Sequence, residues 1–333
     1  MTAAATPATR GGNVADPFVR SLRRESWTLG LLLLLVVVLA YTKFIQPGYG
    51  VSGIQSLAIN VLPLALAAVA QAFAVISGGM DLSIAAMMAL TSVVAATQMQ
   101  GHSPEYAVVV VIGVLLLGVA IGAINGGLIA VTKVPDIIVT LAMSFVWAGL
   151  ALRILPVPGG SAAKWLTELI KGSVGIDWIP KAAVVLVVLV AAVWIPLRRS
   201  RVGLSLYAVG SNPLAAFRSG VTVGRTKIFA YALTGFFSAA AGLSLTATTA
   251  NATPVPGPYT LLSVAAVVLG GVSLAGGRGG VIGPIVAVVV LALIQLDMAL
   301  LAINSNLATI VQGAILIAVL MLGSLAELRR RAR

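Results

Sequence analysis

The sequence predicts an all-α, polytopic membrane protein, first of all from its composition. Hydrophobic residues make up 59% of the 333 residues, whereas charged residues make up only 9%. An ordinary soluble domain carries about 25% charged residues. A chain this apolar cannot cover a water-facing surface, and in lipid its backbone polar groups are satisfied only inside helices or closed barrels.

Apolar runs long enough to cross a bilayer are the second observation. A spanning helix needs about 20 mostly apolar residues. We expect about ten such helices within one transmembrane domain, residues 27–324. The third, eighth and tenth are shorter or richer in glycine, which indicates broken or re-entrant helices there. The expected spans are 27–45, 54–77, 81–98, 106–131, 136–155, 180–197, 226–248, 260–275, 281–300 and 306–324.

The basic residues predict how these spans are oriented. With ten spans, both termini lie on the same side of the membrane. If that side is the cytoplasm, all but five of the 21 Lys and Arg residues are cytoplasmic, as the positive-inside rule favours. We therefore expect a multi-pass protein of the bacterial plasma membrane with cytoplasmic termini. The five outer residues are Lys43, Arg153, Lys164, Lys171 and Lys181.

The segments outside the spans are few. Residues 1–26 are rich in Ala, Thr, Gly and Arg and are expected to form a disordered cytoplasmic tail, and residues 325–333 a basic one. A signal peptide is the alternative for the N-terminus, but the apolar run Leu29–Tyr41 lacks a following small-residue cleavage site. Long loops are expected at 156–179 outside and at 198–225 in the cytoplasm.

A short internal repeat relates the third span to the eighth. Leu82–Ala86 reads Leu-Ser-Ile-Ala-Ala, and Leu262–Ala266 reads Leu-Ser-Val-Ala-Ala. In a ten-span protein these helices run in opposite directions. An inverted repeat would then relate spans two to five to spans seven to ten, as in many transporters. A chance match of small and apolar residues is the alternative.

Two motifs combine glycine with polar residues. In Ser77–Ser83, glycines allow sharp turns, and Asp81 or Ser83 can either cap a helix or contact a substrate. An Asp at a helix centre in lipid costs about 2.5–3.5 kcal/mol, so Asp81 is expected at a helix end or facing protein. In the second motif, Gly118, Gly122 and Gly126 recur every fourth residue and favour close helix packing, with Asn125 hydrogen-bonding across helices.

The cytoplasmic loop contains a further helix signal. Asn212 suits an N-cap, Pro213 the first helical position and Gly220 a C-terminal stop. We expect a two-turn amphipathic helix that either lies at the membrane surface or inserts into a soluble partner. Ala216 is expected on its partner-facing surface.

Several enzyme classes are excluded. The chain has no Cys and a single histidine, His102, which excludes disulfides and cysteine nucleophiles and makes His-based metal sites and Ser-His-Asp triads improbable. The glycine-rich segment 269–280 lacks the lysine and hydroxyl of a phosphate-binding P-loop, and no P-loop occurs elsewhere. We expect no bound cofactor, no metal and no ATPase site on this chain.

Together, from about residue 50 to 320, these motifs resemble the permease subunits of ribose-type ABC sugar importers, a group related to branched-chain amino-acid and nucleoside permeases. The chain departs from the family pattern at Leu214, where an acid is expected, and at Thr260 and Leu262. The resemblance is carried by Gly78–Ser83, by Asn125 and Gly126 with Pro135, by Asn212, Pro213, Ala215, Ala216, Ser219 and Gly220, and by Ala265–Gly279.

The resemblance implies a subunit that moves a sugar or sugar-like polyol into the cytoplasm by alternating access. ATP would be used by two separate ATPase subunits. A second permease subunit, identical or different, and an extracytoplasmic solute-binding protein complete the expected partners, without nucleic acid. The implied ATPase-coupling residues are Asn212, Pro213, Ala215, Ala216, Arg218 and Gly220. The candidate pathway residues are Asn60, Gln71, Asp81, Ser83, Asn125, Thr140, Gln295 and Asp297; an interhelical hydrogen bond is the alternative for each.

A secondary transporter and an ABC permease for nucleosides or branched-chain amino acids are the alternative functions. Proton coupling normally requires a buried ionisable residue, and only Asp297 lies well inside an apolar span. Two readings of Asp297 stay open. Either the ninth helix ends near residue 296 and the carboxylate is solvated, or it faces the path and accepts several hydroxyl hydrogen bonds.

Overall fold

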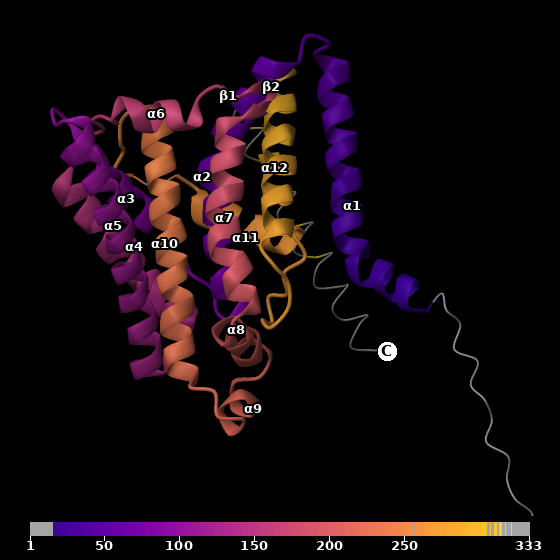
Figure 1. Cartoon of the computed structure of the whole chain (residues 1–333), viewed down its shortest axis with the longest axis vertical. Helices are drawn as coiled ribbons and strands as arrows, with labels where there is room; N and C mark the ends of the chain where they lie inside the picture. The colour runs from indigo at the N-terminus through magenta and orange to yellow at the C-terminus, as the bar shows by residue number, and fades with distance from the viewer. Residues whose placement is uncertain are drawn as a thin grey trace, which may run out of the picture.

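The computed structural model forms an upright bundle of helices (Figure 1). It describes residues 16–255 and 257–304, and single positions at 307, 310, 311, 313, 314, 317 and 321. Most of the expected tenth span, the tail at 325–333 and residues 1–15 lie outside the described residues.

Six helices are long and apolar enough to cross a membrane. Shorter apolar helices are the 29–45 part of α1 (Asp16–Ile45), α3 (Ile84–Met99) and α11 (Tyr259–Leu269). Each of the first nine expected spans coincides with one of these helices, so the prediction of a polytopic, helical membrane protein is confirmed. The six longer helices are α2 (Val51–Ile76), α4 (Pro104–Thr132), α5 (Asp136–Ile154), α7 (Lys181–Arg199), α10 (Val223–Thr249) and α12 (Ile282–Leu300).

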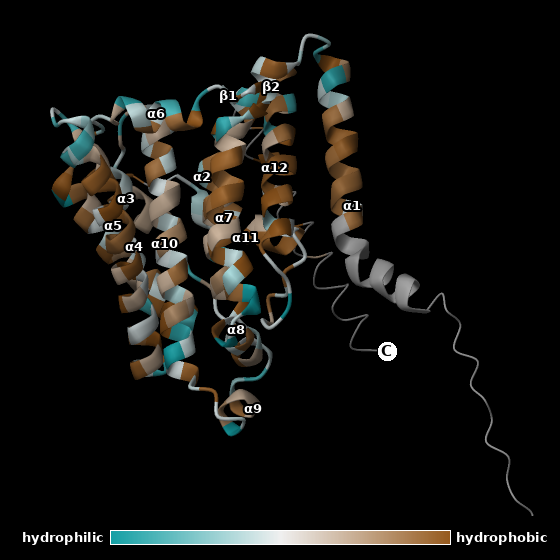
Figure 2. Ribbon diagram, in the orientation of Figure 1, coloured by the Kyte–Doolittle hydropathy of each residue, from teal (hydrophilic) through white to brown (hydrophobic). Residues whose placement is uncertain are grey.

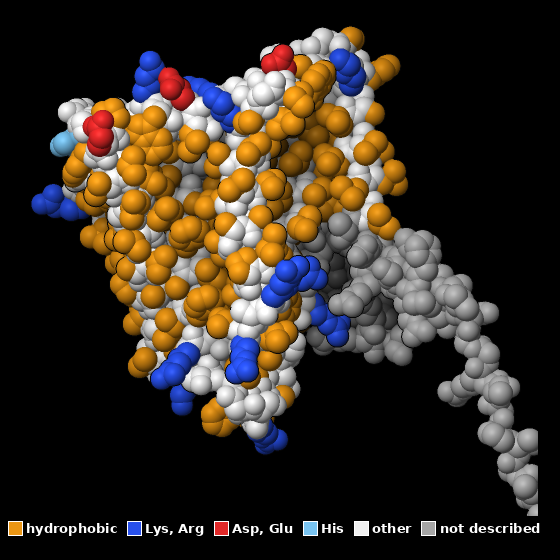
Figure 3. Space-filling model, viewed as in Figure 1, with side chains coloured by type: hydrophobic (Ala, Val, Ile, Leu, Met, Phe, Trp, Pro, Cys, Tyr) orange, Lys and Arg blue, Asp and Glu red, His pale blue; other side chains and the backbone are white. Residues whose placement is uncertain are grey.

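The two ends of the bundle carry different short elements. One end, called here the hairpin end, carries α6 (Lys164–Ile170) and the antiparallel strands β1 (Ser173–Val174) and β2 (Ile176–Pro180). The other, the α9 end, carries α8 (Arg201–Ser211) and α9 (Pro213–Arg218). An apolar belt lies between them (Figure 2). Among the described side chains on the face in Figure 3, the acidic ones lie at the hairpin end.

Three boundaries differ from the sequence prediction. The first helix begins at Asp16, within the segment 1–26 that was expected to form a tail. Asp and Pro suit a helix's first turn, and Arg, Leu and Glu continue it. The loop at 156–179 contains α6 and the strands, whose turn uses Gly175 at φ +68°. The loop at 198–225, expected in the cytoplasm, contains α8, which was not predicted.

Helix α10 packs against α4 through the predicted glycine stripe. A Cβ added at Gly122 would overlap the carbonyl oxygen of Tyr231, and one added at Gly118 would overlap the backbone of Gly235. The two helix backbones therefore touch along these glycines, as small residues allow in membrane proteins. The close-packing interpretation of the stripe is confirmed.

Three non-helical segments interrupt the bundle. Residues 77–83 separate α2 from α3. Residues 250–255 and 257–258 precede α11, and residues 270–281 follow it. With 11 residues, α11 is too short to cross a bilayer that needs about 20. The prediction of a broken helix at the eighth span is therefore confirmed.

Candidate functional site

A groove of about 650 Å3 opens near the hairpin end, among the first half of α2, the start of α11 and the second half of α12. Small-molecule sites in proteins occupy about 300–1,000 Å3. We call this cavity the hairpin-end groove. Its lining joins apolar residues such as Leu57 and Val288 to uncharged polar ones. The polar lining residues are Gln46, Tyr49, Ser52, Ser56, Asn60, Tyr259 and Gln295.

A polar stripe on α2 forms one wall of the groove. Ser52, Ser56 and Asn60 follow one another at every fourth position, which places them on one helix face, and all three are exposed. Gln295 is exposed on the opposite wall, on α12. Polar side chains in a span normally face protein or water rather than lipid. Two of the predicted pathway residues, Asn60 and Gln295, thus meet at a surface suited to water or a polar ligand.

Three other predicted pathway residues form a buried network beside the 77–83 segment. Asp81 Oδ1 accepts hydrogen bonds from the backbone N–H of Ser83 (2.7 Å) and from its hydroxyl (2.6 Å). Asn125 on α4 donates to Ser83 Oγ (2.9 Å) and accepts from the Trp147 indole of α5 (3.2 Å). Asp81, Ser83 and Asn125 have no exposed surface. Their side chains tie α3, α4 and α5 together and do not line the groove.

Thr140 and an ion pair that the sequence did not predict lie next to the 77–83 segment. Thr140 Oγ1 accepts from the backbone N–H of Leu82 (3.0 Å) and is itself buried. Asp136, the first residue of α5, binds Lys227 Nζ of α10 at 2.6 Å. Tyr231 donates its hydroxyl to the same carboxylate oxygen at 2.8 Å. The sequence signal for this pair was one acid and one base near the starts of two spans, separated by about ninety residues.

Gln71 and Asp297 are buried without complete hydrogen bonding. Neither side-chain amide atom of Gln71 has a hydrogen-bond partner among the described residues, and the same holds for Asp297 Oδ1. The expectation that the helix ends near residue 296 is wrong: α12 continues to Leu300 because the residues after Asp297 are good helix formers. Asp297 is only 6% exposed and is not among the groove-lining residues.

Asp297 lies near the turn that joins α1 to α2. Burial, and after it the negative charge of Asp297, raises the pKa of Tyr49 in this turn. The phenol therefore keeps its proton at neutral pH and donates to the carbonyl of Gly53 (3.2 Å). Lys43 donates to the carbonyl oxygens of Pro47 and Tyr49, both at 2.7 Å. The turn that borders the groove is thus fixed by three side-chain hydrogen bonds.

Helix α9 has the predicted ends. The Asn212 side chain accepts from the backbone N–H of Ala215 at 3.0 Å, Pro213 is the first helical residue, and Gly220 has φ +85°. The N-cap and C-terminal stop are confirmed, although the helix has only six residues.

The predicted orientation of α9 is wrong. Ala216 is only 5% exposed and faces the chain itself. The residues that α9 presents outward include Leu214 and Phe217, which are 59% and 67% exposed. Two large apolar side chains exposed at a charged end of the bundle indicate a contact surface for a partner. The sequence prediction rested on the small residue Ala216 instead. Of the other implied coupling residues, Asn212, Pro213, Ala215, Arg218 and Gly220 are exposed.

No cluster of three or more His, Cys, Asp or Glu side chains that could hold a metal ion occurs within the described part of the chain.

Comparison with known proteins gives consistent matches over nearly the whole chain. The family model described as "Branched-chain amino acid transport system / permease component" matches residues 53–320. The ribose import permease protein RbsC of Bacillus subtilis is 35% identical over 300 residues, covering 88% of this chain and 90% of the relative. The corresponding protein of Haemophilus influenzae is 32% identical over 292 residues, covering 86% and 90%.

A second kind of relative is the autoinducer 2 import system permease protein LsrD of Escherichia coli. It is 27% identical over 324 residues, covering 92% of this chain and 94% of the relative. No solved structure gives a significant match.

Proposed function

Because this chain belongs to the family of branched-chain amino acid transport system permease components, we propose that it is the transmembrane permease subunit of a binding-protein-dependent ABC importer. Its transported solute would be a sugar or a sugar-like polyol, as the names of the ribose and autoinducer 2 permeases suggest. ATP would be hydrolysed by separate subunits and not by this chain.

The groove with its uncharged polar wall is the observation that carries this proposal. A neutral polyol offers many hydroxyl groups, and each hydroxyl can donate and accept. The amides of Asn60 and Gln295 can do both as well, on opposite walls of the same cavity. A charged amino acid would instead call for a charged or helix-dipole partner. Among the described residues, the groove lining contains no Asp, Glu, Lys or Arg.

The partners follow from which surfaces are open. The exposed polar stripe of the groove has to be shielded from lipid. A second permease subunit, identical or different, would cover it. Two ATPase subunits would bind α9 through Leu214 and Phe217, and the solute-binding protein would dock at the hairpin end. The chain would cross the plasma membrane ten times, with both termini and α9 in the cytoplasm.

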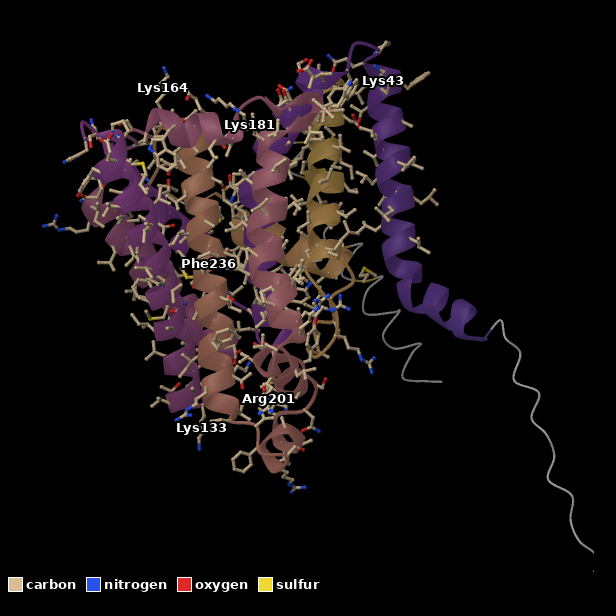
Figure 4. The ribbon with its side chains drawn as sticks, in the orientation of Figure 1. Lys43, Lys133, Lys164, Lys181, Arg201 and Phe236 are labelled. Carbon is tan, nitrogen blue, oxygen red and sulfur yellow. The ribbon has the colours of Figure 1, made fainter. Side chains whose placement is uncertain are left out.

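Two observations support this finer topology. Lys133 and Arg201 lie at the α9 end, whereas Lys43, Lys164 and Lys181 lie at the hairpin end (Figure 4), which is the partition expected from the positive-inside rule. For the inverted repeat, α3 and α11 are both short and both follow a non-helical segment. The backbone N–H of Ala85 also donates to Thr260 Oγ1 at 3.1 Å, beside the repeated motifs.

The groove is tested by Asn60→Leu and Gln295→Leu in the assembled importer. Each change removes up to two hydrogen bonds to the solute, at about 0.5–1.5 kcal/mol each, so uptake at low solute concentration should fall by about tenfold. Asn251→Leu, the same substitution in an exposed residue outside the groove, is the control. Unchanged uptake in both groove variants, with normal assembly, would remove the groove from the path.

The coupling surface is tested by Phe217→Asp, which places a charge on an exposed apolar residue of α9. Because the side chain is exposed, the fold should persist while ATPase binding weakens. Co-purification of the ATPase measures binding, and ATP hydrolysed per solute measures coupling. Full binding and coupling in this variant would show that α9 is not the contact.

The orientation is tested by cysteine labelling, because the chain has no cysteine of its own. In intact cells, a membrane-impermeant thiol reagent should label His102→Cys, at the exposed α3–α4 turn, and should not label Phe217→Cys. The opposite labelling pattern would invert the topology.

A further inference from the structure

Three segments far apart in the sequence meet near the α9 end, and each contributes glycine. They are Ile76–Gly78 at the end of α2, Gly210–Ser211 at the end of α8, and Gly276–Gly277 in the segment before α12. We call this contact the glycine junction. At its centre the backbone N–H of Gly277 donates to the carbonyl of Ile76 at 2.9 Å.

Gly210 lies directly against this hydrogen bond. A Cβ added at Gly210 would overlap the Ile76 oxygen and would lie 2.6 Å from the Gly277 nitrogen. One methyl group at residue 210 would thus overlap both the acceptor oxygen and the donor nitrogen of this hydrogen bond. The bond therefore exists only because residue 210 has no side chain.

The neighbouring glycines leave equally little space. A Cβ at Gly276 would lie 2.7 Å from both the Gly210 oxygen and the Gly78 Cα. Gly78 and Gly276 also have φ values of +77° and +82°, which other residues rarely adopt. Apart from the Ser211 hydroxyl, which lies against Gly277, the contacts at these glycines are between backbone atoms. A displacement of one segment can therefore be absorbed only to a small extent by rotamer changes in the others.

A side-chain hydrogen bond ties α8 to the same segment. The hydroxyl of Tyr207 donates to the carbonyl of Gly279 at 2.8 Å. Burial raises the pKa of Tyr207, against the opposing effect of the Arg198 charge, so the phenol remains a donor at neutral pH. Two separate contacts therefore hold α8 to residues 276–279.

The junction connects α9 to the walls of the groove. Asn212, two residues after Gly210, is both the C-cap of α8 and the N-cap of α9. From Ile76, α2 runs back to Asn60 in the groove, about 24 Å at 1.5 Å per residue. From Gly277 the chain enters α12, which carries Gln295. The junction is thus linked along the chain to two helices that line the groove: α2, which contains Pro63 between Ile76 and Asn60, and α12, which begins five residues after Gly277.

We propose that Gly210 is a positioning residue that transmits movement of α9 to the hairpin-end groove. Movement of α9 passes through the close-packed backbones of the glycine junction to α2 and α12, so that ATPase motion changes the groove on the other side of the membrane. The proposal rests on the coupling role proposed above for α9, and deepens it by naming the contact that transmits the motion.

Gly210→Ala tests the contact without straining the local backbone. Gly210 lies inside helix α8 and has no positive φ, so alanine suits its conformation and by propensity favours the helix. The only penalty is overlap with the Ile76–Gly277 hydrogen bond. Gly127→Ala is the matched control, because Gly127 is also helical, in α4, and has open space where a Cβ would lie.

The first measurement uses the complete importer, with its ATPases and solute-binding protein, in proteoliposomes. We expect Gly210→Ala to keep ATPase binding and basal ATP hydrolysis, and to reduce the solute transported per ATP by about tenfold, within the 5- to 150-fold range of typical coupling energies. A merely structural role would lower assembly and hydrolysis together. Wild-type transport per ATP in Gly210→Ala would overturn the proposal.

The second measurement needs no substitution at the junction, so it decides the matter even if Gly210→Ala fails to assemble. Spin labels at Ser219→Cys, an exposed residue at the end of α9, and at Leu274→Cys flank the junction. Labels at Ser52→Cys and His102→Cys report the groove end of α2 against the α3–α4 turn. Between nucleotide-free and ATP-analogue-bound complexes, the first distance should stay constant and the second should change. A first distance that changes as much as the second would overturn the proposal.

Failure of the inference and failure of the proposed function are distinguishable. If Phe217→Asp leaves ATPase binding and coupling intact, α9 is not the contact and the proposed function is at fault. If Phe217→Asp uncouples the complex but Gly210→Ala behaves as wild type, the coupling role stands and the glycine junction is not its route.

Discussion

Replacing Asp136 by alanine removes the carboxylate that holds together α5, α10 and the 77–83 segment. Asp136 Oδ2 binds Lys227 Nζ at 2.6 Å and accepts the Tyr231 hydroxyl at 2.8 Å. The side chains of Lys227 and Asp136 keep only 11% and 16% of their exposed area. The substitution leaves the Lys227 ammonium group buried without its counter-ion.

The expected destabilisation follows from these contacts. Removing one partner of a buried ion pair costs about 3–5 kcal/mol, and the residual exposure of both side chains places this pair at the low end, about 3 kcal/mol. The double variant Asp136→Leu with Lys227→Met removes both charges. It leaves the Tyr231 hydroxyl with a weaker partner, the Met80 carbonyl at 3.4 Å, which should cost only about 1 kcal/mol.

Reversible unfolding in mixed micelles, followed by the helical circular dichroism signal, measures both values. Arg225→Met is the control, because Arg225 is an exposed cation on the same helix, two residues before Lys227. We expect the single variant to lose about 3 kcal/mol, the double about 1 kcal/mol and the control almost nothing. A double variant as unstable as the single one would refute the reasoning, because the penalty would then not come from an unpaired charge.

Two further predictions concern local packing. Asn212→Ala removes the hydrogen bond to the Ala215 N–H and should weaken α9 by about 1 kcal/mol, seen as faster amide exchange at 213–218; exchange at the wild-type rate would contradict the capping role. Gly122→Leu places a side chain against the Tyr231 carbonyl of α10 and should destabilise the chain by about 1–3 kcal/mol. Gly113→Leu is the control: a Cβ there would meet open space, so the unfolding midpoint should stay unchanged. Equal midpoints for the two leucine variants would count against close α4–α10 packing.

Much of the fold could be predicted because lipid imposes simple rules. Helix length and apolar composition located the first nine spans, and the fourfold spacing of Gly118, Gly122 and Gly126 located a helix contact. The ends of α9 were predictable because caps are local: Asn212 and Gly220 act on neighbouring residues.

The site was less predictable because it depends on contacts between distant segments. Asn60 and Gln295 could be proposed as polar residues in apolar spans, but their meeting across one groove could not. Asp81 carried the same polar signal and lies in a sealed network instead. Sequence pattern reports that a residue is polar within a span, and only the helix packing determines whether it faces a cavity or a neighbour.

Ala216 shows a related limit. A six-residue helix has too few turns for its periodicity to reveal which face is buried. The burial of Ala216 and the exposure of Phe217 are set by how α8 and α9 fold against the bundle. The glycine junction was equally invisible, because Gly78, Gly210 and Gly277 belong to separate motifs.

Solute uptake by proteoliposomes of defined composition tests the central claim most directly. The vesicles contain the ATPase subunits and either the wild-type chain or Phe217→Asp. The solute-binding protein is added at the hairpin end together with a radiolabelled sugar or polyol that it binds. We predict uptake only when ATP is supplied at the α9 end and the binding protein is present, and its loss in Phe217→Asp. Uptake of the same solute by the chain alone, driven by a proton gradient without ATP, would contradict the account.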